Sequence, residues 1–184
     1  MASTDLTADC ARCAALCCVG LAFDRSSLFA FDKAAGVPCA NLDAGGRCRI
    51  HADLAIKGFG GCRAFDCQGA GQAVTQGLFG GASWRDDPAV LAPMMRAFSV
   101  MRPAHEALGL LRQARRLPLP ASVLEHLAAV ERGLEPAGGW TRRDVEDGRV
   151  ERATETAQAF LRSLAPLLEA ADIGRDGAGL RRGA

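Results

Sequence analysis

Four cysteines crowd into the stretch CARCAALCC at positions 10–18, and four more follow before position 68. The rest of the 184-residue chain contains no cysteine. Thiolates are soft, strong metal ligands, and eight of them can fill two four-coordinate zinc sites or ligate an iron–sulfur cluster. The first third of the chain is therefore predicted to be organised around metal. The candidate ligands are Cys10, Cys13, Cys17, Cys18, Cys39, Cys48, Cys62 and Cys67.

A disulfide framework is the alternative, because small secreted scaffolds also carry many cysteines. The first residues, MASTDLTAD, lack a basic stretch followed by an apolar run, so they do not resemble a secretory signal. No stretch approaches the roughly 18 uninterrupted apolar residues of a membrane span. We therefore expect a cytoplasmic protein whose thiols are reduced and free to bind metal.

The charge balance argues against nucleic-acid binding. The chain has 22 basic and 21 acidic residues, a net charge of +1, and neither half is strongly basic. Binding to a phosphate backbone needs a basic surface. Only Lys33 and Lys57 among the basic residues are lysines, which we interpret as a compositional bias towards arginine. The expected partners are metal and a protein docked on the C-terminal helices, with no nucleic acid and no membrane.

Three amphipathic patterns follow Gly80-Gly81, where the composition changes. Apolar residues recur at three- and four-residue steps over 87–116, 121–134 and 143–171, which predicts three helices. Pro103 lies inside the first and should kink or divide it. Such helices with short connections pack as an antiparallel bundle or cap.

The predicted fold is mostly α-helical and has three parts. A cysteine-rich, metal-organised region covers 5–81, a helical region that forms a three-helix bundle or cap covers 82–172, and a disordered tail covers 173–184.

The histidines and methionines give weaker signals. Methionines at helical spacing in 87–116 are typical core residues, and His105 on the same face is expected to be packed and hydrogen-bonded. His126 lies off the apolar stripe of its helix and is expected to be solvated. His51 follows Cys48 at a spacing compatible with a shared metal, but a helix-start position without a ligand role is favoured.

Catalysis is not favoured by the sequence. A nucleophilic thiol at Cys62 or Cys67, activated by His51, is chemically conceivable because a neighbouring base lowers a thiol pKa. No pair of carboxylates stands isolated in an apolar setting, and no nucleophile motif surrounds Ser83. The sequence leaves open whether the protein is an enzyme and leans against it.

Helical geometry suggests which of the cysteines at 10–18 bind the same metal centre. If residues 10–18 are helical, Cys10, Cys13 and Cys17 fall within an arc of roughly 60°, and Cys18 lies about 80° beyond Cys10. Three thiolates could then share one centre. This tight run differs from the paired knuckles of common structural zinc sites, and it favours an iron–sulfur cluster slightly over zinc.

The fourth ligand of that centre is expected to come from the glycine-rich part of the chain. Cys62 follows Gly58-Phe59-Gly60-Gly61, where the backbone can approach a cluster closely, and Cys67 lies five residues later. Either thiol could complete the centre. Three cysteines then belong to a second site or remain as packed thiols, namely Cys18, Cys39 and Cys48.

Taken in order, the cysteine motifs form a specific series. They are Cys10-x2-Cys13-x3-Cys17-Cys18, Pro38-Cys39-x-Asn41-Leu42, Gly46-Arg47-Cys48-Arg49-Ile50-His51 and Gly61-Cys62-Arg63-x-Phe65-x-Cys67. This series resembles the YkgJ-type cysteine-cluster family, described as a zinc- or iron-chelating domain. That family commonly has two residues between its second cysteine and the Cys-Cys pair, whereas this chain has three. The resemblance implies metal binding by the cysteines.

A narrower resemblance covers roughly residues 5–170. It is carried by 29–39 (FAFDKAAGVPC), 58–62 (GFGGC), 65–72 (FDCQGAGQ), Thr75, 79–81 (FGG), Trp84-Arg85 and Met101-Arg102. These stretches are similar to the N-terminal module of actinobacterial pentapeptide-repeat proteins, in which a β-helix follows the cysteine module. Here 178–182 (AGLRR) could form one degenerate repeat, and a single repeat cannot stack. The resemblance therefore implies the module without a β-helix.

Overall fold

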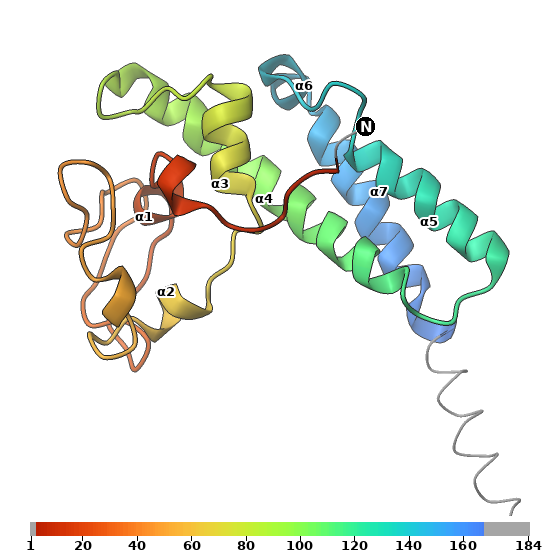
Figure 1. The fold of residues 1–184 in the computed structure, drawn as a ribbon, viewed down its shortest axis with the longest axis horizontal. Coiled ribbons are helices and arrows are strands. Elements are labelled where there is room, and N and C mark those ends of the chain that lie inside the picture. The colour runs from red at the N-terminus through yellow and green to blue at the C-terminus, as the bar shows by residue number, and fades with distance from the viewer. Residues whose placement is uncertain (1–2, 168–184) are drawn as a thin grey trace, which may run out of the picture.

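The computed structural model describes residues 3–167, which are mostly α-helical and form no strand. The predicted helical class is confirmed at this level. The cysteine-rich part contains short helices only: η1 (Cys10–Arg12), α1 (Leu16–Gly20), η2 (His51–Asp53), α2 (Gly60–Ala64), α3 (Ala70–Gln72) and η3 (Ala73–Leu78). Then follow η4 (Pro88–Val90), α4 (Leu91–Ala114), α5 (Ala121–Leu134), α6 (Arg142–Glu146) and α7 (Arg149–Ser163) (Figure 1). Within 3–167, no helix is both long and apolar enough to cross a membrane.

The first two helix predictions are confirmed. The helix α5 has the predicted bounds, and α4 lies within the predicted range 87–116. Asp87 caps the start of η4 by accepting a hydrogen bond from the backbone N–H of Ala89 at 3.0 Å. Pro103 lies inside α4, but the helix is not divided there.

The third helix prediction was wrong, because the pattern beginning at 143 forms two helices, α6 and α7. The break falls at Gly148, whose φ of +68° lies in the left-handed region that glycine adopts without strain. Thr141 and Asp144 form a capping box that starts α6. The end of the predicted third helix and the predicted tail at 173–184 lie outside the described residues.

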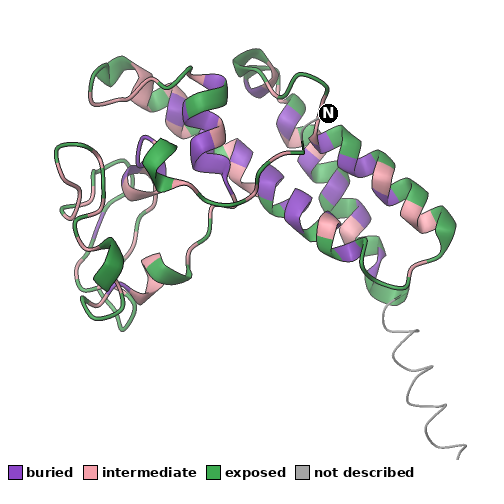
Figure 2. Cartoon of the chain, in the orientation of Figure 1, coloured by how far each residue is buried: buried purple, intermediate pink, exposed green. Residues whose placement is uncertain are grey.

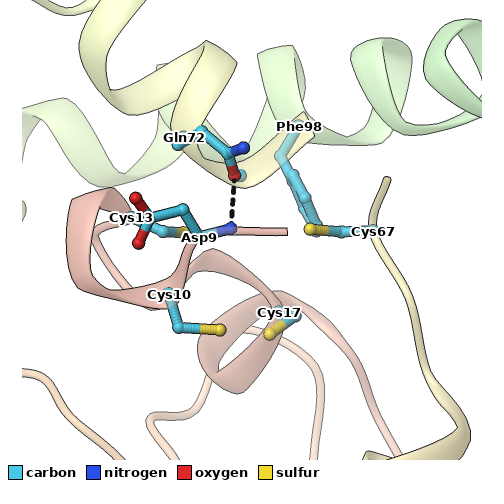
Figure 3. Close-up of a pocket in the computed structure, with 8 residues that line it drawn as sticks. Asp9, Cys10, Cys13, Cys17, Cys67, Gln72 and Phe98 are labelled. Atoms are coloured by element: carbon cyan, nitrogen blue, oxygen red, sulfur yellow. Dashed lines mark hydrogen bonds between the residues drawn. The ribbon is translucent and has the colours of Figure 1, made fainter. Parts of the chain in front are cut away.

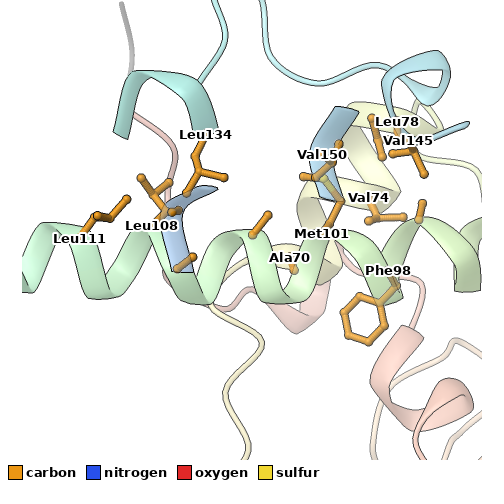
Figure 4. Close-up of a cluster of buried hydrophobic side chains, with 14 of the residues drawn as sticks. Ala70, Val74, Leu78, Phe98, Met101, Leu108, Leu111, Leu134, Val145 and Val150 are labelled. Carbon is orange, nitrogen blue, oxygen red and sulfur yellow. The ribbon is translucent and has the colours of Figure 1, made fainter. Parts of the chain in front are cut away.

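The helix α7 packs against both α4 and α5. Fully buried side chains meet between these helices, and burying each one contributes about 1.5–3 kcal/mol (Figure 4). They include Leu108, Leu111, Leu127 and Val150. Met94 and Met101 are buried too, which confirms that the methionines are core residues.

The histidines of the long helices differ in their surroundings. His105 is buried in α4, and its Nδ1–H donates to the backbone carbonyl of Gln68 at 2.6 Å, as expected. Burial lowers the pKa of His105, so its ring is neutral at pH 7. His126 is exposed, as predicted, although its ring lies edge-on to Phe160 at 4.8 Å between ring centroids.

The same hydrophobic core continues into the cysteine-rich part. Ala14 and Leu16, near α1, and Val74 in η3 pack with Phe98 and other buried residues of α4. Both α1 and α3 lie against α4 (Figures 1 and 4). The helix α4 therefore forms one wall of the cysteine-rich part as well as of the helical part.

The loops between α1 and α3 contrast with this core. Of residues 21–64, all of which the structure describes, only Lys33 and Phe59 are buried (Figure 2). In place of a hydrophobic core, this segment has a small aromatic cluster. Phe23 stacks on Phe29 with 4.3 Å between ring centroids, and Phe31 lies edge-on to Phe59 with 4.9 Å between centroids. Burial on this scale cannot offset the entropy of ordering so many residues, so this segment needs another source of stability.

Candidate metal centre

Four of the eight cysteines line one small cavity (Figure 3). Cys10 comes from η1, Cys13 follows it, Cys17 lies in α1, and Cys67 precedes α3. The sulfurs of Cys10 and Cys17 point towards each other in Figure 3. The cavity holds about 20 Å³, which is room for one particle of about the size of a water molecule. Cys10, Cys13 and Cys17, which were predicted to share a centre, thus line one cavity together with Cys67.

The reason for this gathering differs from the prediction, because residues 10–18 do not form one helix. The helix η1 ends at Arg12, Cys13 is extended with φ −109° and ψ 138°, and Ala15 is left-handed with φ +57°. The helix α1 then begins at Leu16. A sharp turn of the chain, and not a helical face, brings the thiols to the cavity.

Polar side chains outside the motif hold this turn. The backbone N–H of Ala14 donates to the hydroxyl of Thr75 at 3.0 Å, and the indole N–H of Trp84 donates to the carbonyl of Ala14 at 2.7 Å. Gln72 accepts from the backbone N–H of Asp9 at 3.1 Å. These tertiary hydrogen bonds satisfy backbone groups that a helix would otherwise pair, so the turn replaces the helix.

Reasoning from ligand chemistry did not assign a role to those three side chains. Gln72, Thr75 and Trp84 do occur among the stretches that resemble the pentapeptide-repeat module. Their appearance in that resemblance was the signal that could have identified them as supports of the cysteine turn.

Cys67 is placed by its connection to α4. The next residue, Gln68, is left-handed with φ +47°, and its carbonyl is the one that His105 binds. The Gln68 side chain lies against Gly109 on α4, where a Cβ would collide with it. The buried histidine therefore anchors the Cys67 segment, and with it one wall of the cavity.

Gly71 permits the closest approach in the cavity. A Cβ at this position would lie 2.7 Å from the sulfur of Cys13 and 3.8 Å from the sulfur of Cys67. The first distance is well inside van der Waals contact, so the α3 backbone and the thiols can meet only if this residue has no side chain.

We expect Gly71→Ala to lower metal affinity and destabilise the cysteine-rich part. Alanine favours a helix over glycine by about 1 kcal/mol, but overpacking costs about 1–3 kcal/mol, so the steric term should prevail. Gly77→Ala is the matched control, because no atom lies within 4 Å of the Cβ it would add. Thermal unfolding and metal titration of both variants check this. Equal metal affinity in the two would contradict it.

The thiols at the cavity influence one another electrostatically. Burial, followed by the neighbouring thiolates, raises the pKa of Cys10, and burial raises that of Cys13. The sulfurs of Cys17 and Cys18 lie 4.0 Å apart. Their mutual hydrogen bond raises the pKa of Cys17 and lowers that of Cys18 to about 7, with Lys33 and Arg85 also lowering the latter.

The other four cysteines lie outside this cavity, and all eight are free thiols in the structure. His51 begins η2, as expected, and is exposed. Within residues 3–167, no three Cys, His, Asp or Glu side chains stand close enough together to hold a metal ion. Side-chain rotation between staggered χ1 positions can move a sulfur without moving the backbone. The backbone arrangement, rather than a finished coordination shell, defines the candidate centre.

Comparison with known proteins gives one match. The chain is 43% identical over 123 residues to the uncharacterized protein YybG of Bacillus subtilis (strain 168). The alignment covers 67% of this chain and 44% of YybG, so the chain spans less than half the length of that relative. No family model matches the sequence. No solved structure matches it either.

Proposed function

We propose that this is a cytoplasmic metal-binding protein that holds zinc or an iron–sulfur centre through cysteine thiolates. Cys10, Cys13, Cys17 and Cys67 are the ligands of the first centre. The observation that carries the proposal is their convergence on one cavity from two stretches of the chain, 10–17 and the segment of Cys67. A thiolate set of this kind suits a soft or borderline metal.

Two features support a structural role for the metal. Residues 21–64 bury almost nothing, so the cysteine-rich part needs a stabilising centre of the kind that folds small metallo-domains. The resemblances to the YkgJ-type family and to the pentapeptide-repeat module point to the same use of the cysteines. In this proposal the N-terminal region is metal-organised, and α4, α5 and α7 form the three-helix cap that docks a protein partner.

The cysteine spacing bears on the identity of the metal. The tight N-terminal cysteine run favours an iron–sulfur centre slightly, whereas four thiolates also suit a tetrahedral zinc ion. Both remain within the proposal, and the experiment below separates them.

Anaerobically purified protein should contain stoichiometric zinc or iron. Elemental analysis measures it, and visible absorption distinguishes the two, because zinc–thiolate sites are colourless while iron–sulfur centres absorb and bleach on reduction. Protein free of both metals, with its thiols paired as disulfides, would overturn the proposal.

A redox-active or cluster-dependent enzyme component is the second candidate function. The sulfurs of Cys17 and Cys18 are 4.0 Å apart. This close approach favours the redox candidate, because it links the thiols of the cavity to the remaining four. Absorption that bleaches reversibly on reduction would favour this candidate over a purely structural centre.

A further inference from the structure

A larger cleft lies between the N-terminal half of α4, the end of η3 and α6. Its volume is about 340 Å³. Sites for small molecules are clefts of roughly 300–1,000 Å³ with mostly apolar walls and a few well-placed polar groups. No cysteine lines this cleft. It is therefore separate from the candidate metal centre and large enough for a small molecule.

The helix α6 forms one wall of the cleft. It is a separate wall because the left-handed backbone of Gly148 ends α6 before α7 begins. Val145 of α6 is buried in the hydrophobic core, and α6 packs against both α4 and α7. The capping box of Thr141 and Asp144 starts the helix, and Asp144 also pairs with Arg149 of α7 at 2.9 Å. The wall is thus held by contacts at both ends.

The floor of the cleft is apolar. Ala97 of α4 and Val145 of α6 are buried there, and Phe79 and Pro93 are half-buried beside them. None of these side chains carries a hydrogen-bonding group. Covering such a surface with an apolar group removes it from water, which is favourable. The floor therefore suits the apolar body of a ligand.

Two arginines line the same cleft from different helices. Arg96 belongs to α4 and Arg142 begins α6, and both are exposed. Within residues 3–167, neither forms an ion pair with a carboxylate. The guanidinium of Arg142 lies over the Phe79 ring, 4.8 Å from its centroid. Stacking uses the face of the guanidinium and leaves the N–H donors in its plane to bind an anion.

One acidic residue limits the charge that the ligand can carry. Glu146 also lines the cleft, so two arginines and one glutamate give it a net charge of +1. Arg142 and Glu146 are four residues apart on α6, a spacing at which ion pairs form, but Arg142 stacks on Phe79 instead. A singly charged carboxylate matches this balance better than a doubly charged phosphate monoester.

We propose that this cleft binds a small monocarboxylate. Its carboxylate pairs with Arg96 and Arg142, and its apolar body covers Phe79, Ala97 and Val145. The fork of N–H donors on a guanidinium matches the two oxygens of a carboxylate. This site goes beyond the proposed function and does not depend on it, because no cysteine takes part.

Two probes test the site, benzoate with an aromatic body and hexanoate with an aliphatic one. Amide NMR spectra of the isotope-labelled full-length protein should show saturable shifts at 92–97 and 142–146 on addition of either carboxylate. Benzyl alcohol, which keeps the ring but lacks the charge, should bind much more weakly. Absence of saturable shifts with both carboxylates, or equal binding of benzyl alcohol and benzoate, would overturn the proposal.

Three substitutions assign the binding to the arginines. Arg96→Ala and Arg142→Ala should each weaken benzoate binding about 10-fold, because each removes charge-assisted hydrogen bonds. Glu146→Gln should strengthen it by removing a like charge. Thermal unfolding of Arg96→Ala should match the wild type, since Arg96 has no ion-pair partner within the described residues.

Arg143→Ala is the matched control. Arg143 is the neighbour of Arg142 on α6, but it pairs with Asp147 at 3.5 Å and does not line the cleft. Its removal should leave benzoate affinity unchanged. If Arg96→Ala binds benzoate as tightly as Arg143→Ala does, the arginines do not hold the carboxylate and the proposal is wrong.

Discussion

Replacing Cys13 or Cys17 with serine should remove metal from the first centre and unfold the cysteine-rich part. A structural zinc site contributes an apparent binding free energy of about 10–16 kcal/mol, which is as large as the whole stability of a typical domain, about 5–15 kcal/mol. Serine is a poor ligand for a soft metal, so a single substitution should forfeit most of this free energy. Elemental analysis and thermal unfolding measure the two effects.

His51→Ala is the control for these variants. His51 is exposed at the start of η2, so its removal should change stability by no more than about 0.5 kcal/mol if it is not a ligand. Full metal content and unchanged stability in Cys13→Ser would contradict the first centre. Metal loss in His51→Ala comparable to that in Cys13→Ser would show that the histidine is a ligand.

Complete removal of metal should loosen residues 10–67 selectively. Only Lys33 and Phe59 are buried between positions 21 and 64, whereas α4, α5 and α7 bury a continuous set of mainly apolar side chains. Hydrogen exchange after anaerobic chelation should therefore show lost protection in the cysteine-rich loops and retained protection in these three helices.

Addition of zinc or reconstitution of the cluster should restore that protection, which controls for irreversible damage to the thiols. The segment nearest α4 should respond least, because Leu16 and Val74 share its hydrophobic core. Unchanged protection across 10–67 after complete removal of metal would mean that the centre does not hold the fold.

Local patterns were enough to predict most of the helical part. The spacing of apolar residues predicted α5 with its observed bounds and placed α4 within two residues of its C-terminal end. It missed the break between α6 and α7, because apolar periodicity continues across Gly148 while the backbone there turns left-handed. Periodicity reports which face is buried, but it does not report the φ of a single glycine.

For the cysteine-rich part, the sequence predicted the candidate ligands better than the path of the backbone. Eight cysteines predicted thiolate ligands, and three of them, together with Cys67, do line one cavity. The assumed helix over 10–18 was wrong, because Thr75 and Trp84 capture the backbone of Ala14 from more than 60 positions away. Contacts of that range leave no local pattern in the sequence.

The sequence by itself determined the helical class, the burial of the methionine face and the set of candidate ligands, because composition and periodicity act over a few neighbouring residues. Only the tertiary structure decided which thiols line one cavity, where Cys67 joins Cys10, Cys13 and Cys17. It also decided that Lys33 is buried and donates to three backbone carbonyls. These choices depend on backbone hydrogen bonds between distant loops, such as the one from Cys39 to Cys18. These hydrogen bonds stabilise the fold only after the chain has closed the loops that they join.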